Sequence, residues 1–420
     1  MADSAPKVAA IERFESTQMI EKKAKTIADY IKRSQHFIVF TGAGVSTSAG
    51  IPDFRGPDGA WTLRAQGRQR TGKTVSTLQA IATPTHMALV ELQNRGYLKY
   101  LVSQNCDGLH RKSGILSDKI SELHGNSNLE VCRDCGKEFI RGMYDTYPPP
   151  DRVLIPADFR AVATYEKTVR DHRTGRKCTR CGGVLHDSIV NFGESLPAEA
   201  LQRAFDNATK ADLCLVLGSS LTVSPANEIP EVTGRRKNAK LVICNLQETP
   251  LDDLADTRVY SKTDDLMVRV MGKLNLPIPQ FILRRRLVIE METNNERHQM
   301  TISGVDEDNT PVTFLKSVKL AYNRRLIRSE PFAIGFRGSL ESGTELKVEL
   351  EFMGHYNEPN LEVTYEYHDV ADARTLYLLA YDPTSGEWKT TKEDQESGNS
   401  IIDLTDDTTI LSDTISNVAF

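Results

Sequence analysis

A short apolar segment that runs straight into a glycine-rich turn constrains the fold of this chain more than any other feature. Residues 36–40 (HFIVF) are typical of a buried strand in a parallel sheet, and Gly42-Ala43-Gly44 follows them directly. Glycines there would let backbone N–H groups approach a phosphate, and a helix beginning behind them would add its positive N-terminal dipole. Thr47 stands where the dinucleotide fingerprint has its third glycine. The pattern alone therefore leaves two interpretations open, a dinucleotide site and an ordinary strand-to-helix turn.

The chain around this segment alternates between helical and strand patterns. Apolar residues in 14–34 recur at helical spacing, and Thr83-Pro84 is typical of a helix start that caps residues 85–95. Strands are expected at 97–103, 188–192, 213–217 and 241–245. Such alternation predicts an α/β fold with a doubly wound, parallel, Rossmann-like sheet over residues 14–276.

Two Cys-x-x-Cys-Gly pairs interrupt the alternation and predict a metal site. The pairs are Cys132/Cys135 and Cys178/Cys181, and each places two thiolates on one tight turn. Four thiolates form a closed tetrahedral set, which favours structural Zn²⁺. The alternative is four unrelated thiols or a redox pair. We expect a small inserted zinc module at about residues 128–186.

The pattern changes beyond the linker Leu276–Pro279. Apolar and polar residues alternate strictly in 346–352 and 361–367, and Asp382–Gly386 is typical of a tight turn. Residues 281–392 are therefore predicted to form an antiparallel β-sandwich of unknown role. The segment 393–420 has no basic residue and is rich in acidic and hydroxyl side chains, which is typical of a disordered acidic tail.

Charge and composition exclude several classes of protein. The net charge of −5 and the pI of about 6.1 provide no global basic field for nucleic acid. No apolar run approaches the roughly 20 residues that a membrane helix needs, and the N-terminus lacks the regions of a signal peptide. Seven cysteines, four of them in pairs, favour metal binding in a reducing compartment. We therefore expect a soluble, intracellular protein with no membrane partner.

Several motifs in this order resemble the sirtuins, the NAD-dependent protein lysine deacylases. The motifs are Gly42–Ser46, Ile51–Arg55, Gln104–His110, Glu122–Gly125, the two cysteine pairs, Phe192–Glu194, Gly218–Ser220 and Asn245–Gln247. Residues 59–63, 121–126 and 245–249 look most like the class IV branch, and Arg173–Arg176 is most similar to sirtuin-seven-like members. The resemblance spans about residues 22–275, so the β-sandwich is expected to lie outside it.

The resemblance implies NAD and Zn²⁺ as cofactors and three catalytic residues. His124 corresponds to the general base that accepts a proton from a ribose hydroxyl. Asp107 would receive the nicotinamide amide, and Asn105 would support the nicotinamide ribose or its water. The products would be nicotinamide, O-acyl-ADP-ribose and deacylated lysine.

The resemblance also implies the binding residues. Those that match the NAD-contacting positions are Ala43, Gly44, Thr47, Phe54, Arg55, Trp61, Gln104, Gly218, Ser220, Asn245, Gln247 and Thr263. For Phe54, covering the reacting ribose and packing in the core are equally compatible with the sequence. The residues that match the substrate-pairing segment are Val190, Phe192, Gly193 and Glu194, which would bind an extended acyl-lysine peptide by strand addition.

Partners and location follow from the same resemblance. The substrates would be acyl-lysine proteins, including histones, in the nucleus rather than the cytoplasm, and the acidic tail suggests contact with nucleic acid only through chromatin. Ile401–Thr405 resembles a SUMO-interacting motif, although a chance apolar cluster explains it equally well. Two other functions stay open: mono-ADP-ribosyl transfer at the same site, and a non-catalytic NAD-responsive scaffold.

Overall fold

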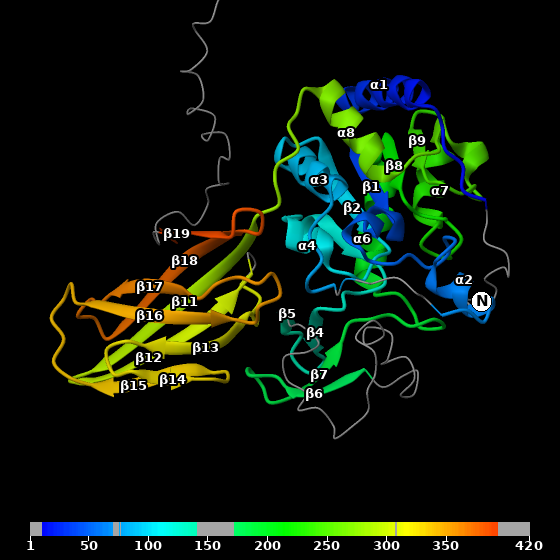
Figure 1. Cartoon of the computed structure of the whole chain (residues 1–420). Helices are drawn as coiled ribbons and strands as arrows, with labels where there is room; N and C mark the ends of the chain where they lie inside the picture. The colour runs from blue at the N-terminus through cyan, green and yellow to red at the C-terminus, as the bar shows by residue number, and fades with distance from the viewer. Residues whose placement is uncertain (1–10, 70–74, 76, 141–171, 307–308, 394–420) are drawn as a thin grey trace, which may run out of the picture.

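A six-stranded parallel sheet forms the centre of the larger half of the molecule, in a computed structural model that describes residues 11–69, 75, 77–140, 172–306 and 309–393 (Figure 1). Its strands are β1 (Phe37–Thr41), β2 (Leu98–Ser103), β3 (Ile120–Glu122), β8 (Leu213–Leu217), β9 (Lys240–Cys244) and β10 (Thr257–Val259). The order β10-β9-β8-β1-β2-β3 places β1 and β8 side by side at the point where the chain reverses its direction across the sheet. In such sheets ligands bind beyond the carboxyl ends of the strands at this switch point.

Helices cover both faces of this sheet because its strands are apolar on both sides. Phe37 and Val39 of β1 pack in one apolar cluster, whereas Ile38 and Phe40 pack in the cluster on the opposite face. The first face is covered by α1 (Thr17–Arg33), α3 (Pro84–Asn94) and α8 (Thr263–Leu274), and the second by α6 (Ala198–Lys210) and α7 (Glu228–Gly234). The predicted doubly wound fold is confirmed.

The shorter helical elements lie in the connections. They are the α-helices α2 (Ala60–Ala65) and α4 (Leu109–Ser113) and the 3₁₀ turns η2 (Ala43–Val45), η3 (Thr47–Ala49), η4 (Ser117–Lys119) and η6 (Asp252–Leu254). The predicted cap of α3 is present as a capping box, in which the Thr83 side chain accepts from the His86 N–H and the His86 ring accepts from the Thr83 N–H.

Two local expectations are wrong. No α-helix begins behind Gly42-Ala43-Gly44; η2 and η3 follow instead, and Gly50 at φ 82° ends them. The turn therefore has no α-helix dipole to offer a phosphate. Residues 188–192 form no strand: the Val190 N–H donates to the His124 carbonyl (3.1 Å), and residues 191–194 form a turn closed by the Glu194 N–H and the Asn191 carbonyl.

A small antiparallel sheet is inserted between β3 and α6. Its strands, in the order β5-β4-β7-β6, are β4 (Leu129–Cys132), β5 (Glu138–Ile140), β6 (Arg173–Lys177) and β7 (Val184–Asp187). Among its described residues, which exclude 141–171, the apolar centre consists of Phe139 and Leu185 with two of the cysteines. Such a small core agrees with a module that depends on a metal.

The C-terminal part is a β-sandwich, as predicted. One sheet has the order β15-β12-β11-β18-β19 and the other has the order β14-β13-β16-β17. The strands are β11 (Leu283–Asn294), β12 (Arg297–Val305), β13 (Leu315–Leu320), β14 (Arg325–Ile327), β15 (Phe332–Arg337), β16 (Glu345–Phe352), β17 (Leu361–Glu366), β18 (Asp372–Asp382) and β19 (Glu387–Glu393). The predicted turn joins β18 to β19, and one apolar core lies between the sheets. The acidic tail lies outside the described residues.

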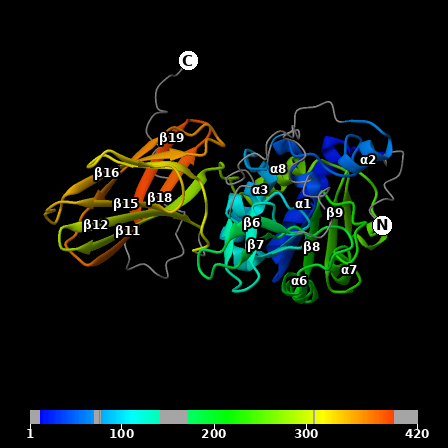
Figure 2. The ribbon, with the colours of Figure 1, turned by 90° about the horizontal axis from the view of Figure 1, so that it is seen from below.

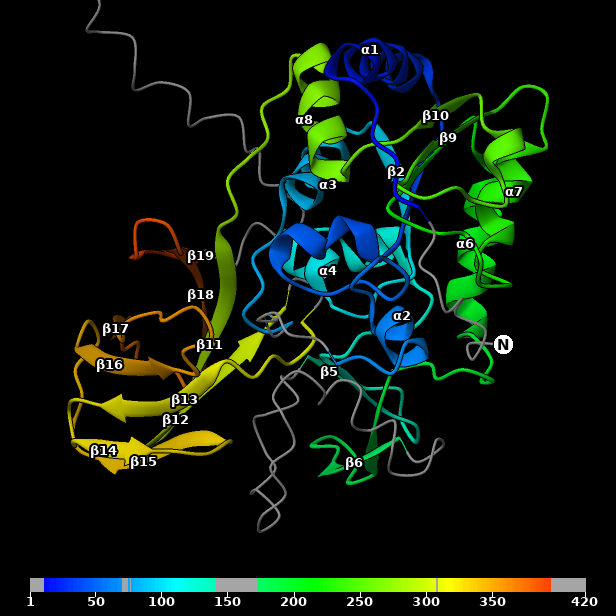
Figure 3. The ribbon, with the colours of Figure 1, turned by 45° about the vertical axis from the view of Figure 1, so that its right-hand side comes forward.

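The sandwich lies beside the larger half and contacts it at several points (Figures 1 and 2). Ile140 at the end of β5 exchanges backbone hydrogen bonds with Pro311 (2.8 Å) and Thr313 (3.1 Å), so β5 meets the sandwich edge-on (Figure 3). Arg111 of α4 pairs with Asp306 at 2.9 Å. Among the described residues, no helix has the length and apolar character to cross a membrane.

Candidate active site and metal centre

A cleft of about 2080 Å³ opens at the carboxyl ends of β1, β2, β8 and β9. Ligand pockets commonly measure about 300–1,000 Å³, so this cleft has room for more than one ligand. All nineteen predicted catalytic, cofactor and substrate residues line it, from Ala43 behind β1 to Thr263 at the start of α8. The structure therefore brings together residues that lie more than 200 positions apart in the sequence.

His124 is held in one orientation at the wall of the cleft. Its Nδ1 lies 2.7 Å from the Gln104 carbonyl oxygen, which can only accept, so Nδ1 carries the hydrogen and Nε2 is the basic nitrogen. Burial lowers the pKa of His124 below its ordinary value, the Gln104 hydrogen bond opposes this effect, and Arg55 lowers the pKa further. A neutral ring at pH 7 with a defined basic nitrogen can act as a general base.

Asn105 and Asp107 are both buried and share the hydroxyl of Ser46. The Ser46 hydroxyl donates to the Asp107 carboxylate at 2.7 Å, and the Leu109 N–H donates to the second oxygen at 2.9 Å. Asn105 donates its amide N–H to the Gly42 carbonyl at 3.1 Å. These bonds fix both side chains, and carboxylate oxygens have further lone pairs with which to accept an amide N–H from a ligand.

The glycines that follow β1 and β8 allow the ends of these two strands to pack closely together. The N–H groups of Gly42 and Gly44 donate to the Leu217 and Gly218 carbonyls at 3.0 and 2.9 Å. A Cβ on Gly44 would lie 2.7 Å from the Gly218 Cα. These two N–H groups therefore join the ends of β1 and β8 and are not the donors to a phosphate that the glycine pattern suggested.

The predicted nucleotide-binding residues on β9, α8 and the 54–61 segment are tied to one another. Gln247 donates its amide N–H to the Arg55 carbonyl at 3.2 Å, and its own carbonyl accepts from the Asn245 amide at 2.9 Å. The Thr263 hydroxyl donates to the Gly44 carbonyl at 3.4 Å. This end of the cleft is consequently rich in polar groups that have fixed positions.

Three aromatic rings form a patch in the lining of the cleft. Phe54 stacks on Trp61 with 6.0 Å between centroids, and Phe192 meets Trp61 edge-on at 5.6 Å. Phe54 is 38% exposed and Phe192 is 41% exposed, so neither is a core residue. Of the two interpretations of Phe54, the geometry favours a ring that covers a ligand.

The predicted substrate segment 190–194 lines the cleft as a turn, with Gly193 at φ 86°. Glu194 accepts from the Asn191 N–H at 2.8 Å and from the His172 ring at 2.8 Å. His172 also contacts Asp187 at 2.9 Å, and although burial opposes it, these two carboxylates raise the pKa of His172. The Val190 N–H donates to the His124 carbonyl, so the segment is attached to the backbone of the proposed general base.

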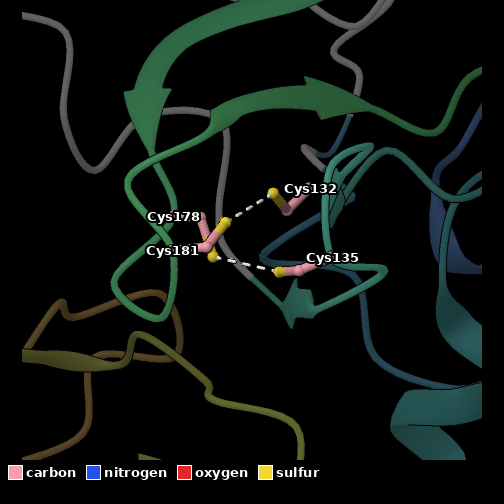
Figure 4. Close-up of side chains that lie close together, drawn as sticks. All are labelled: Cys132, Cys135, Cys178 and Cys181. Carbon is pink, nitrogen blue, oxygen red and sulfur yellow. Dashed lines mark hydrogen bonds between the residues drawn. The ribbon is translucent and has the colours of Figure 1, made fainter.

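The four predicted metal ligands lie together on the small sheet (Figure 4). All four sulfurs are within 4.8 Å of one another, with 3.5 Å between Cys132 and Cys181 and 3.7 Å between Cys135 and Cys178. Tetrahedral Zn²⁺ with Zn–S distances of about 2.3 Å requires sulfurs about 3.8 Å apart, so the set fits zinc. The other three cysteines lie elsewhere and are free.

Sequence reasoning missed the residues that hold the others in place. Ser46 orients Asp107, Ser219 accepts from the Gln104 amide at 2.9 Å, and His172 holds Glu194. Ser46 and Ser219 lie inside the motifs that were already identified, which is the signal that could have found them. No local signal connects His172 with Glu194, because the contact joins the residue before β6 to the turn at 191–194.

Comparisons with known proteins agree with this geometry. The model of the Sir2 family matches residues 68–225. The NAD-dependent protein deacetylase SRT1 of Arabidopsis thaliana is 34% identical over 376 residues, which cover 82% of this chain and 75% of that protein. The NAD-dependent protein deacetylase sirtuin-7 of Bos taurus is 38% identical over 64% of each chain. The solved complex "Sir2-p53 peptide-NAD+" is 32% identical, covers 59% of this chain and 97% of that one, and has a TM-score of 0.44.

The Arabidopsis match corrects one expectation and places the chain in a family. Residues 1–276 are only about two thirds of the chain, so a match over 82% includes part of the β-sandwich. The expectation that the sandwich lies outside the resemblance is therefore wrong, whereas the predicted likeness to sirtuin-seven-like members is confirmed. The chain belongs to the Sir2 family, the sirtuins.

Proposed function

We propose that this protein is an NAD-dependent protein lysine deacylase that releases nicotinamide, O-acyl-ADP-ribose and free lysine. The observation that carries the proposal is the His124 ring, whose Nδ1 is bonded to the Gln104 carbonyl in the same cleft as Asn105 and Asp107. The names of the Arabidopsis and bovine relatives describe the same activity. Residues 14–276, with the module at 128–186, would form the catalytic unit.

Each group in the cleft has a task in this reaction. The carbonyl oxygen of the acyl-lysine would attack the ribose carbon of NAD as nicotinamide leaves, and water would then release free lysine and O-acyl-ADP-ribose. Asp107, oriented by Ser46, accepts the nicotinamide amide, and Asn105 supports the ribose. Nε2 of His124 accepts the proton of a ribose hydroxyl. Phe54, stacked on Trp61, covers the reacting face and excludes water until nicotinamide has left.

The remaining groups bind the two substrates and the metal. The polar groups at Gln247, Asn245 and Thr263 hold the adenosine end, and the turn 190–194 holds the peptide. Zn²⁺ on the four thiolates has no open position, so its role is structural.

A mass-spectrometric assay tests the proposal. Acetyl-, succinyl- and long-chain-acyl-lysine peptides are incubated with NAD and the full chain, and O-acyl-ADP-ribose is measured. We expect turnover of neutral acyl groups, and a loss of roughly 10²–10⁴-fold in His124→Ala, which is typical for the removal of a general base. His368→Ala is the matched control, because His368 is exposed on the sandwich. Equal rates for wild type and His124→Ala would refute the role of His124, and no product from any peptide would refute the function.

The two other functions are separated by one labelling experiment. NAD labelled in the ADP-ribose part is incubated with and without acyl-lysine peptide. Label fixed on protein without peptide indicates mono-ADP-ribosyl transfer. A non-catalytic scaffold would bind NAD but would neither deacylate the peptide nor transfer ADP-ribose to protein.

We extend the proposal to histone lysines as substrates and to the nucleus as location, on the motif resemblance to sirtuin-seven-like members. Incubation with acetylated histone tails, followed by localisation of the tagged chain, tests both parts. Contact with nucleic acid would occur only through chromatin.

We also propose that Ile401–Thr405 binds SUMO by adding a short strand to a sheet edge. The segment lies outside the described residues, so its sequence alone supports the idea. Titration of a 396–410 peptide into SUMO tests it, and an absence of binding at high micromolar concentration would reject it.

A further inference from the structure

A loop of the β-sandwich reaches the wall of the active-site cleft. The loop connects β16 to β17, and its Tyr356 hydroxyl donates to the Ala80 carbonyl at 3.1 Å. The Tyr356 ring packs against Phe281 (6.2 Å between centroids) in a cluster that joins Ala82 and Met87 to the sandwich. Burial raises the pKa of the Tyr356 hydroxyl, so it remains a donor at physiological pH.

Lys112 of α4 holds the same wall from the catalytic half. Its Nζ donates to the Thr77 carbonyl at 3.0 Å and to the Leu78 carbonyl at 3.1 Å. The same ammonium group lies 5.5 Å from the centroid of the Tyr356 ring, which is within cation–π range. Two side chains from two parts of the fold therefore bind three carbonyls of one short segment.

The other side of this segment faces the proposed NAD site. Thr77, Leu78 and Gln79 line the cleft. The segment is also tied to the turn behind β1, because the Val75 N–H donates to the Gly50 carbonyl (3.2 Å) and the Thr83 hydroxyl donates to the Val45 carbonyl (3.0 Å). Residues 77–82, here called the cleft-wall segment, thus lie between the sandwich loop and the residues that match NAD-contacting positions.

The sandwich holds Tyr356 firmly. The Tyr356 N–H donates to the Glu358 carboxylate at 2.8 Å, and Glu358 pairs with Arg285 at 2.9 Å. The Arg285 guanidinium lies 5.0 Å from the Phe314 ring and 5.2 Å from the Phe352 ring, inside the sandwich. The position of the hydroxyl is therefore set by the sandwich interior and not by the cleft.

We propose that Tyr356 is a positioning residue for the NAD site, through which the β-sandwich holds the cleft-wall segment in the conformation that binds NAD. This inference rests on the proposed function of the cleft. Holding a wall in its bound conformation lowers the ordering cost of ligand binding and so raises affinity. The sandwich is then part of the enzyme's cofactor site, which agrees with a match to the Arabidopsis deacetylase that continues into it.

The test compares Tyr356→Phe with Tyr377→Phe in the full chain. Both changes remove one hydroxyl that donates to a backbone carbonyl, but Tyr377 donates to Thr364 within the sandwich (3.0 Å). Hydrogen exchange is measured on peptides that cover residues 77–82, NAD affinity is measured by calorimetry, and KM and kcat are measured for NAD and for an acetyl-lysine peptide.

We expect Tyr356→Phe to accelerate exchange in 77–82 and to weaken NAD binding roughly 3- to 10-fold, as the loss of one hydrogen bond permits. KM for NAD should rise, while kcat and the KM for peptide change little. Tyr377→Phe should match the wild type in all of these. Lys112→Met, which removes the second support, should weaken NAD binding in the same direction.

The outcomes distinguish this inference from the proposed function. If the wild type binds no NAD, both the proposed function and this inference are wrong. If the wild type binds NAD and Tyr356→Phe shows unchanged exchange in 77–82 or unchanged NAD affinity, the function stands and the inference is wrong. An equal effect from Tyr377→Phe would also overturn it, because general destabilisation of the sandwich would then explain the result.

Discussion

The catalytic half and the β-sandwich bury their polar side chains in different places. In the catalytic half, Asn105 and Asp107 are buried just beyond the carboxyl end of β2 and line the cleft. In the sandwich, Arg285 and Glu358 form a pair whose side chains are 7% and 0% exposed, and the Arg285 guanidinium lies against the rings of Phe314 and Phe352.

The direction of the strands explains this difference. Parallel strands all end on the same side of a sheet, so the residues that follow them gather at one edge and form a site. Antiparallel strands end on alternate sides, and the sandwich has no such shared edge. We conclude that the parallel half carries the chemistry, whereas buried charge in the antiparallel half stabilises one arrangement of its loops, including the loop of Tyr356.

Removal of one zinc ligand should produce the largest effect and should remain confined to the catalytic half. Cys132→Ser should lose the metal and unfold the small sheet. Structural zinc contributes an apparent binding free energy of about 10–16 kcal/mol in small domains, and the described part of the sheet has little apolar core. Zinc content and deacylation are measured together. Cys106→Ser, a free cysteine outside the cluster, should keep its zinc; a full zinc content in Cys132→Ser would contradict the four-thiolate site.

Loss of the buried charge pair should destabilise the sandwich. Glu358→Ala leaves the Arg285 charge buried without this partner, and breaking such a pair costs about 3–5 kcal/mol of unfolding free energy. The chain has two tryptophans, Trp61 in the cleft and Trp388 in the sandwich. In a Trp61→Phe background, urea unfolding followed by Trp388 fluorescence therefore reports on the sandwich.

Two further variants sharpen that measurement. Glu349→Ala removes an exposed carboxylate that pairs with Lys319 on the sandwich surface and should change the midpoint little. Arg285→Met combined with Glu358→Leu removes both charges and should restore much of the stability. If Glu358→Ala and Glu349→Ala give the same urea midpoint by Trp388 fluorescence, the buried pair has no stabilising role.

The smallest effect concerns the pH dependence of the catalytic half. His124 accepts a proton only when neutral, and burial, the first of its influences, lowers its pKa below 6.5. Protonation on the acid side should therefore reduce kcat/KM along a limb centred below pH 6.5. A pH profile of kcat/KM checks this. An acid limb centred above pH 6.5 would contradict the assignment and would point to His172, whose pKa is raised.

Much of the fold was predictable because local patterns agree with the tertiary structure. The strand at 213–217 has the expected bounds, the Thr83 cap is present, and the alternating segments near 346–352 and 361–367 are β16 and β17. The strand expected at 188–192 is absent because residues 191–194 form a turn, in which the Glu194 N–H donates to the Asn191 carbonyl. Backbone bonds to Leu217 and Gly218 likewise fix the turn behind β1, and no local pattern encodes them.

The sequence by itself determined the kinds of groups that this protein brings to its site: four thiolates in two knuckles, an imidazole, a carboxylate and an amide behind strands. Only the tertiary structure decided which sulfur faces which, which nitrogen of His124 is basic, and that Tyr356 touches Ala80 across 276 positions. The physical reason is the range of the interactions. Residue type and spacing set propensity within one element, whereas a hydrogen bond of about 3 Å depends on how whole elements pack.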